Sequence, residues 1–438
     1  MKNLLIIAYY FPPSGGPGVQ RVLKHIKYLP EFGWNPIVLT VENGEYQAID
    51  MSLIDEVSEK TIVRKSRIFE PYDIYRKFTG RKKGEALDVN NIKNDNQKSP
   101  FVDRVAELIR ATIFIPDARI GWFFSAKKEA RKILEEYKID AIYSSSPPYT
   151  CSVIANSLQK ETKLPWVAGF RDPWTGFLTT PNRWFLPAAI DRSMEHSVFK
   201  NATAVEAAWQ GIIKDALEKY DDLDESKFHQ VPNGYDSSDF PEGEYVRNDK
   251  FTLTYTGSLY GRRNPKSLFE AIEKLLKTEK IKKEKLKLVF VGRFGDEVIE
   301  MFDNVSFKEC IETVGYVTHK ESISYLIKSE ALLLIVDEAK ESEEIIPGKV
   351  YEYLGTKRPL FAIAPNQSAI AKLIHETEAG LVAHQTEVDR IAENLFEYYH
   401  HWEQDLPITT PNVAEIEKYE RRNASKKLAE ILDGVLDS

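Results

Sequence analysis

The stretch from Glu341 to Ile363 holds residues whose types and spacing fit a chemical site. Glu344 and Glu352 are eight positions apart, and Lys349 lies between them. Carboxylates accept hydrogen bonds from hydroxyl groups, and a cation near the start of a helix favours bound anions. A solvated acidic loop would explain Glu344 equally well, because runs of charge usually face water. Glu352 lies in an otherwise apolar segment, so we expect its carboxylate to have a hydrogen-bonded partner.

The elements around these residues are predicted to be a strand, a loop, a short helix and a second strand. The apolar run 331–336 is undiluted by polar residues, as in a strand that is covered on both faces. Pro347 opens a helix that Gly355 can close, and residues 359–363 form the next strand. In a parallel sheet such a loop and helix start lie at the carboxyl edge, where ligands bind.

The N-terminal part predicts a similar unit. Residues 4–10 form a strand, and a glycine-rich turn then leads through a helix to a second strand at 36–40. Gly16 and Gly18 in that turn let backbone amides approach a ligand, although a plain tight turn would explain them too. The fingerprint Gly-x-Gly-x-x-Gly is absent, so a nicotinamide dehydrogenase is not supported.

Two charged residues end a later strand of this first half. Arg171 and Asp172 directly follow the predicted strand 166–170. Loops at the carboxyl edge of a doubly wound sheet form its sites, so this pair is a functional candidate. Residues 202–205 have the pattern of the last strand of the first domain.

A second strand, loop and helix begin at residue 251. The loop after strand 251–256 starts at Gly257 and carries Arg262 and Arg263. Two arginines beside free backbone amides are suited to a diphosphate, because guanidinium groups bind phosphate through two parallel hydrogen bonds.

A further segment of the second half, 312–317, ends at Val317 and is followed by His319. We expect His319 to cap a helix or to lie on the surface. No Asp-x-Asp pair lies in a loop where it would suggest a metal site.

Length and composition suit a globular protein of two domains. A chain of 438 residues exceeds one ordinary core, and its net charge of -8 argues against a general nucleic-acid binder. Cys151 and Cys310 cannot form a disulfide framework, which fits a reducing cytoplasm. We interpret the apolar N-terminus as a strand rather than a signal peptide, and no run approaches the ~20 apolar residues of a membrane span.

Residues 45–125 interrupt the alternation of strands and helices and are expected to be an insertion. Residues 60–83 carry nine basic side chains against two acidic ones, and 84–99 are polar without periodicity. Residues 101–110 predict an amphipathic helix, and aromatic residues follow it. Such a segment could rest on an anionic membrane surface. The alternative is a solvated basic loop with a helix packed on the first domain.

Several motifs together resemble the retaining glycosyltransferases of family 4, which have the two-domain GT-B fold. They are the spacing Glu344-x7-Glu352 followed by Tyr-Leu-Gly-Thr-Lys-Arg-Pro, the sequence Phe-Arg-Asp-Pro-Trp at 170–174 found in one branch of that family, the crossing segment Pro-Asn-Gly-Tyr-Asp at 232–236, and the N-terminal glycine-rich loop before Arg21. The resemblance covers the chain apart from about 45–125. It implies an α/β protein of two Rossmann-like, doubly wound domains that face each other across a cleft.

The resemblance also divides the chain. It implies an N-terminal acceptor-side domain at 1–205 that contains the insertion, a linker region at 206–250, a nucleotide-sugar domain at 251–400 and a C-terminal helix at 401–438 that crosses back to the first domain.

Residue roles follow from the same resemblance. Glu352 would hold the ribose hydroxyls and Glu344 the donor sugar. Other donor-binding residues would be Arg262, Arg263 and Lys349 on the phosphates, with Gly16, Gly18, Gly257 and Val317 bordering the donor. Ser258 stands where the family usually has an arginine, so the other cations would have to replace it.

The implied catalytic residues are Asp172, Arg171 and Glu344. Asp172 stands where other members of the family carry a histidine near the reacting sugar, and Arg171 precedes it. The absent histidine makes Asp172 the candidate for its role.

The implied activity is the transfer of a hexosyl group from a nucleotide diphosphate sugar to a hydroxyl of a glycan or lipid-linked glycan, with retained configuration and without a metal or other cofactor. The implied setting is polysaccharide synthesis for the bacterial cell envelope, in the cytoplasm or peripherally on the inner face of the membrane. A nucleotide-sugar epimerase is one alternative, although it would need more carboxylates and histidines for proton transfer. A non-catalytic nucleotide-sugar binding protein is the other.

Overall fold

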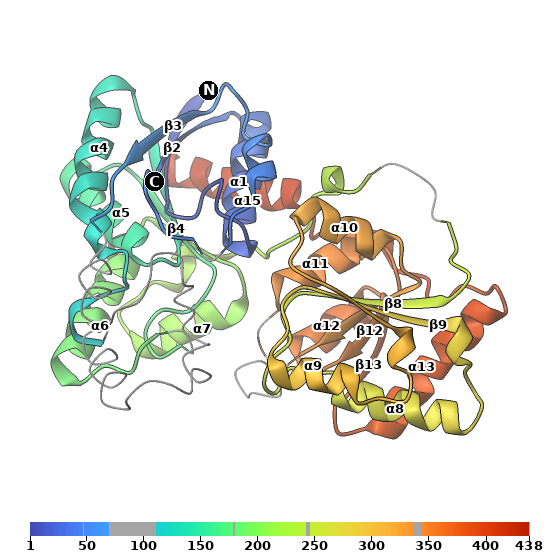
Figure 1. The fold of residues 1–438 in the computed structure, drawn as a ribbon. Coiled ribbons are helices and arrows are strands. Elements are labelled where there is room, and N and C mark those ends of the chain that lie inside the picture. Colours follow the sequence, from blue (N-terminus) through green and yellow to red (C-terminus); the bar gives the residue numbers. More distant parts are fainter. Residues whose placement is uncertain are drawn as a thin grey trace. The chain divides into compact units, whose positions relative to one another are not determined.

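The structure, a computed structural model, describes residues 1–46, 48–69, 111–177, 180–241, 246–336, 344 and 346–437. The chain divides into two compact units, Met1–Pro232 with Ala424–Ser438, and Asn233–Asn423. Each unit is an α/β domain built on one parallel sheet (Figure 1). The predicted pair of doubly wound domains is therefore confirmed.

The first domain has seven strands in the order β3-β2-β1-β4-β5-β6-β7. Their bounds are β1 (Lys2–Ala8), β2 (Trp34–Val41), β3 (Ile62–Ser66), β4 (Ala141–Ser146), β5 (Trp166–Phe170), β6 (Ala204–Ala207) and β7 (Phe228–Gln230). The described helices of this domain are α1 (Pro17–Tyr28), α4 (Phe123–Glu136), α5 (Thr150–Thr162), α6 (Phe185–Asn201), α7 (Gln210–Lys219) and α15 (Arg421–Asp437).

Helices cover both faces of this sheet. Successive side chains of a strand point to opposite faces, so Leu5 and Ile7 of β1 share a core with α4, α5, α6 and α7. Leu4 and Ile6 share the other core with α1 and α15 (Figure 1). Leu428 and Leu432 of α15 are fully buried there, so the C-terminal part of the chain completes the core of the N-terminal domain.

The first domain extends beyond the predicted last strand at 202–205. The strand lies at β6, and α7 and β7 follow it in the same sheet before the domain ends at Pro232. Only Phe228 of β7 is buried, and three residues are too few to show a strand period. Residues 206–232, which the sequence assigned to a linker region, thus add an edge strand.

The second domain has six strands in the order β10-β9-β8-β11-β12-β13. Their bounds are β8 (Phe251–Thr256), β9 (Leu286–Val291), β10 (Ile311–Val314), β11 (Ala331–Ile335), β12 (Leu360–Ile363) and β13 (Gly380–Ala383). The described helices are α8 (Lys266–Lys277), α9 (Asp296–Asp303), α10 (His319–Ile327), α11 (Gly348–Gly355), α12 (Ala369–Glu376), α13 (Val388–Glu403) and α14 (Val413–Glu417). α8, α9 and α13 share one core with the sheet, and α10, α11 and α12 share the other.

α11 ends at Gly355, where the sequence predicted its end. Its C-cap is Thr356, and Lys357 rather than a glycine takes the positive φ of 57° that follows the helix. A Cβ on Gly355 would lie 2.6 Å from the ring of Tyr235, so glycine is needed there for close packing. None of the described helices is long and apolar enough to cross a bilayer.

In both sheets, the order in which the chain adds strands reverses at the first strand of the domain. In the first domain, β2 and β3 lie on one side of β1, and β4 to β7 lie on the other. In the second domain, β9 and β10 lie on one side of β8, and β11 to β13 lie on the other. Open parallel sheets bind ligands at the carboxyl ends of the strands at such a switch point. The loops that follow these strands are therefore where each domain should carry its site.

Candidate functional site

The second domain places Gly257 and Lys349 together at its switch point. Gly257 follows β8 with a φ of 121°, which favours glycine, and a Cβ there would lie 3.4 Å from Nζ of Lys349. Lys349, in the first turn of α11, donates a hydrogen bond to the carbonyl of Thr256 at 3.2 Å. Its Nζ also lies 3.9 Å from the ring centroid of Tyr255. The glycine thus leaves room for a lysine held over an aromatic ring.

Arg263 brings a second positive charge to this point. Its Nε is buried and has no hydrogen-bond partner among the residues that the structure describes. Burial and the nearby charge of Arg263 lower the pKa of Lys349 well below its usual range, while Glu352 opposes the shift. Two cations with an unused donor beside a helix N-terminus are suited to bind a multiply charged anion. A bound anion would also relieve the repulsion between them.

Glu352 has the hydrogen-bonded partner that the sequence predicted. Its Oε1 lies 3.1 Å from Nε2 of His319, and about a fifth of each side chain is exposed. His319 was expected to cap a helix or lie on the surface, and this expectation was wrong. Thr318 is the N-cap of α10 and forms a capping box with Glu321, so the ring of His319 can turn to Glu352.

The structure gives the exposure of the other predicted donor residues, Arg262, Val317 and Glu344. Arg262 is exposed one residue before Arg263, and Val317 is half-buried just ahead of α10. Glu344 is exposed, but 337–343 and Ile345 lie outside the described residues. The structure therefore brings together Gly257, Arg263, Lys349 and Glu352. That Glu344 lies near these four residues stays a prediction.

In the first domain, Arg171 joins the ends of β4 and β5. Its Nη1 donates to Oγ of Ser145 at 2.5 Å, its Nη2 to the carbonyl of Pro147, and its backbone N–H to the carbonyl of Ser146 at 2.9 Å. A Cβ on Gly18 would lie 3.6 Å from Nη2 of Arg171. The predicted glycine-rich turn and the predicted Arg171 are thus neighbours at the switch point of this sheet, and Gly16 begins α1 as its N-cap.

Asp172 is half-buried beside Arg171 and makes no hydrogen bond with any described residue. Burial raises the pKa of its carboxyl, and the charge of Arg171 opposes this shift. A carboxylate without a partner and with a raised pKa is suited to contact a polar substrate group.

Buried acids of α6 hold the segment that follows Asp172. Asp191 accepts a hydrogen bond from the indole N–H of Trp174 at 2.9 Å, and Glu195 accepts one from the backbone N–H of Thr175 at 3.0 Å. The side chains of Asp191 and Glu195 are 2% and 0% exposed. Each buried carboxylate has hydrogen-bond donors, so the segment has one well-defined course.

The sequence analysis missed both acids. They are four residues apart, and Val198 continues the same buried face of the helix. Acidic residues at the apolar positions of a helical period were the signal that could have identified them.

Arg21 does not face a ligand. It is 3% exposed, and its Nη2 donates to Oε1 of Glu206 and to the carbonyl of Val231, each at 2.7 Å. Tyr143 donates to the other oxygen of Glu206 at 2.6 Å, and His25 lies 3.5 Å from Oε1. This buried network secures the chain where it leaves the first domain. Burial alone would raise the pKa of Glu206, but the charge of Arg21, the hydrogen bond and charge of His25 and the hydrogen bond from Tyr143 together lower it to about 2.

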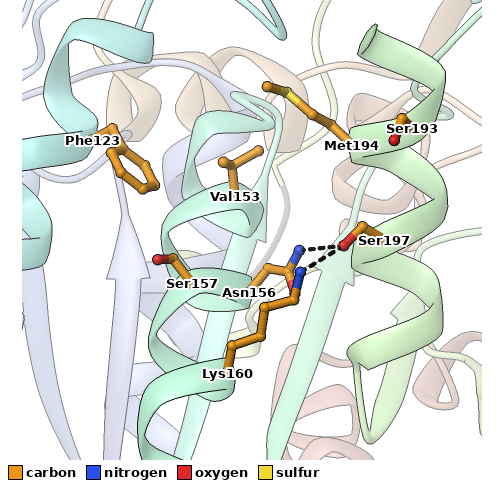
Figure 2. A pocket seen from close by; sticks show the side chains of 8 residues that line it. All are labelled: Phe123, Val153, Asn156, Ser157, Lys160, Ser193, Met194 and Ser197. Carbon is orange, nitrogen blue, oxygen red and sulfur yellow. Dashed lines mark hydrogen bonds between the residues drawn. The ribbon is translucent and has the colours of Figure 1, made fainter. Parts of the chain in front are cut away.

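The first domain also has a pocket of about 300 Å³ between α4, α5 and α6. It is lined by Phe123, Val153, Asn156, Ser157, Lys160, Ser193, Met194 and Ser197, none of which was a predicted site residue. Figure 2 shows Asn156 and Lys160 both pointing to the hydroxyl of Ser197, at 3.1 and 3.0 Å. Three of its polar side chains therefore bond to one another, while the hydroxyl of Ser157 accepts a hydrogen bond from Lys127 at 2.8 Å. Among the described residues, no group of three or more His, Cys, Asp or Glu side chains could hold a metal ion.

Comparison with known families finds a match that lies within the second domain. Residues 237–407 match the family of glycosyl transferases group 1. No match was found among curated proteins.

Solved structures with the same fold cover almost the whole chain. HepE from Anabaena in complex with UDP is 11% identical with a TM-score of 0.60, and covers 99% of this chain and 100% of its own. A glycosyltransferase from Rickettsia africae is 16% identical with a TM-score of 0.61, and the match covers 100% of this chain and 99% of the Rickettsia chain. Sucrose-phosphate synthase from Thermosynechococcus elongatus is 10% identical with a TM-score of 0.65, covering 100% of both chains. The family match and these likenesses support a glycosyltransferase with the GT-B fold.

Proposed function

We propose that this protein is a retaining glycosyltransferase, similar to family 4, that moves a hexosyl group from a nucleotide diphosphate sugar to a hydroxyl group. The observation that carries the proposal is the pair of Arg263 and Lys349. Arg263 has an unused buried donor, and Lys349 has a lowered pKa in the first turn of α11. A diphosphate supplies the negative charge that this pair lacks. The UDP in the complex of the similar HepE is a molecule of this class.

The donor would be bound by residues of the second domain. Arg263, Lys349 and Arg262 bind the diphosphate, and Glu352, oriented by His319, accepts hydrogen bonds from the ribose hydroxyls. Glu344 binds the donor sugar.

The first domain would serve the acceptor and the reacting sugar. Arg171 is fixed by the end of β4, and Asp172 lies beside it with a free carboxylate, in the place of the histidine of the family. We assign to Asp172 a contact with a hydroxyl of the reacting sugar, and to Arg171 a positioning role.

In the transfer step, the bond between the anomeric carbon and the diphosphate oxygen breaks, and the acceptor oxygen bonds to the same face of that carbon. The acceptor proton passes to the departing diphosphate. Preorganised cations stabilise the charge that develops on the leaving group, and such stabilisation is usually the largest catalytic term. The cations would do this without a metal ion.

We propose a glycan or lipid-linked glycan as the acceptor. This setting fits polysaccharide synthesis for a cell envelope, on the cytoplasmic face of a membrane with which residues 60–83 make peripheral contact. The support for that contact is the excess of nine basic over two acidic residues in this stretch.

Donor hydrolysis tests the function without knowledge of the acceptor. Wild-type protein incubated with UDP-, GDP-, ADP- and dTDP-hexoses should slowly release free sugar from one nucleotide family, with the donor's anomeric configuration retained in the first-formed product by NMR. Binding without any turnover would favour a non-catalytic binding protein. Conversion of the donor sugar into its epimer would favour an epimerase.

A further inference from the structure

The first domain carries large apolar side chains on its surface around the start of α6. Phe185 is 85% exposed, Leu186 52%, Trp184 48% and Ile190 41%, and Ile113 on the preceding segment is 63% exposed. We call these five residues the α6 patch. The indole N–H of Trp184 donates to the hydroxyl of Thr112 at 2.9 Å, which joins the two segments into one surface. Soluble monomers rarely expose so many large apolar side chains together.

The first half of α6 is inverted relative to an ordinary surface helix, whereas its last turn buries Val198 and Phe199 in the usual way. Phe185, Leu186 and Ile190 lie on its solvent side, whereas the acids Asp191 and Glu195 lie on its buried side. A surface helix normally buries its apolar stripe and exposes its charges. The apolar side of α6 is therefore available to a partner, and the buried acids keep the helix in this orientation.

Two phenylalanines extend the exposed apolar surface to α4. Phe124 is 81% exposed and Phe69 is 68% exposed, and the backbone N–H of Phe69 donates to Gly121, which precedes α4. Phe123 packs edge-on against Phe124, with ring centroids 5.2 Å apart, and lines the pocket of Figure 2 together with Met194 of α6. The pocket thus connects the phenylalanines with the helix that bears the α6 patch.

Exposed cations accompany this surface although the chain as a whole has a net charge of -8. They are Lys128 one helical turn after Phe124, Arg192 two residues after Ile190, and Arg67 two residues before Phe69. Arg67 also forms an exposed ion pair with Glu42 at 3.0 Å, which a lipid phosphate would have to replace. Aromatic and aliphatic side chains with basic residues beside them are the composition of a surface that binds anionic lipid. Trp184 fits the same setting, because its amphipathic ring suits the boundary between headgroups and acyl chains.

We propose that this face of the first domain binds a bilayer containing anionic lipids, with the α6 patch inserted between headgroups and the cations Arg67, Lys128 and Arg192 on lipid phosphates. A second copy of the chain is a poorer occupant, because a two-fold contact through the patch would bring equal cations toward each other. The inference gives the membrane contact proposed above a defined surface. It can fail while the transfer reaction stands, because vesicle binding and donor hydrolysis are independent measurements.

Vesicle flotation with a matched pair of variants tests the proposal. Phe185→Ser with Ile190→Ser removes two exposed side chains of α6. Ile299→Ser removes one side chain from α9 in the second domain, and its exposure of 45% is close to the 41% of Ile190. All three side chains lie on the surface, so the melting temperature should stay close to that of the wild type.

The wild type should bind phosphatidylglycerol vesicles more strongly than phosphatidylcholine vesicles, and added salt should weaken the binding. The double variant should lose about tenfold or more in affinity, since it places less apolar surface in the bilayer, while Ile299→Ser should bind like the wild type. Donor hydrolysis should be the same in all three proteins. Equal binding by the double variant, or no binding by the wild type, would overturn the proposal. A concentration-dependent dimer that only the double variant loses, without vesicle binding, would replace the bilayer by a second copy.

Discussion

Replacing Glu206 by glutamine should destabilise the first domain strongly and change how its stability depends on pH. The substitution keeps the size of the side chain and an acceptor for Tyr143, but it removes the negative charge that faces Arg21 at 2.7 Å. The buried guanidinium of Arg21 would then lose the carboxylate that it faces. Removing one partner of a buried ion pair typically costs about 3–5 kcal/mol in the free energy of unfolding.

The pKa of Glu206 gives the pH dependence and its sign. It is lowered from 4.5 to about 2 in the folded protein. A carboxyl whose pKa is lower in the folded state contributes its full stabilisation above its unfolded pKa of ~4.5, and loses it as the pH falls toward its folded pKa. This difference corresponds to about 3 kcal/mol, since one pKa unit is about 1.4 kcal/mol. Glu206→Gln should therefore have a shallower decline in stability below about pH 5.

Urea unfolding followed by tryptophan fluorescence measures this effect. Six of the seven tryptophans lie in the first domain, so the signal reports mainly on that unit. Arg21→Met combined with Glu206→Gln should recover much of the lost stability, because no unpaired charge remains. Glu161→Gln, which removes the surface ion pairs of Glu161 with Arg131 and Lys127, should change stability little. If Glu206→Gln were as stable as the wild type with the same pH slope, the network would not secure the domain as described.

Glu195→Gln should lower the transfer rate and leave nucleotide affinity unchanged, because it weakens the hydrogen bond to Thr175 after the Arg-Asp pair. A rate assay and calorimetry with the nucleotide that the wild type binds measure the two quantities separately, and an equal loss of affinity would contradict this role. His319→Ala should weaken nucleotide binding about tenfold, because it removes a hydrogen bond that orients Glu352. Calorimetry measures this change, and an unchanged affinity would show that Glu352 does not need the support of His319. Above about pH 7, where the nucleotide phosphates are ionised, nucleotide affinity should fall as the pH rises, because Lys349 loses its proton at a lower pH than an ordinary lysine. Lys349→Met should bind nucleotide weakly at every pH. If the affinity of the wild type did not change with pH, the assignment of Lys349 to the phosphates would be refuted.

Local patterns predicted much of the second domain's site. The apolar run before Glu344, the proline at the start of α11 and the glycine after β8 are short-range signals, and they placed Lys349 and Gly257 at one edge of the sheet. The polar position of Glu352 in an apolar helix predicted a partner. The sequence did not identify His319 as that partner, because the two residues lie on different helices and meet only through the packing of α10 against α11.

The supports of the first site depend on contacts between distant segments. Asp191 and Glu195 have no motif, and their role becomes visible only when α6 packs against the loop after β5. Arg21 lies beside a glycine-rich turn, yet burial against Glu206 turns it away from that turn's ligand-facing side. β7 escaped prediction because an edge strand of three residues has almost no periodicity.

Nucleotide binding by the second domain tests the central claim most directly. Calorimetric titration of UDP, GDP, ADP and dTDP should show that one nucleotide binds the wild type, that Arg263→Gln and Glu352→Ala each lose at least about tenfold, and that Arg390→Gln, at an exposed position of α13, binds like the wild type. If no nucleotide binds the wild type, or if Arg263→Gln and Glu352→Ala bind as tightly as the wild type, then Arg263, Lys349 and Glu352 do not form a donor site.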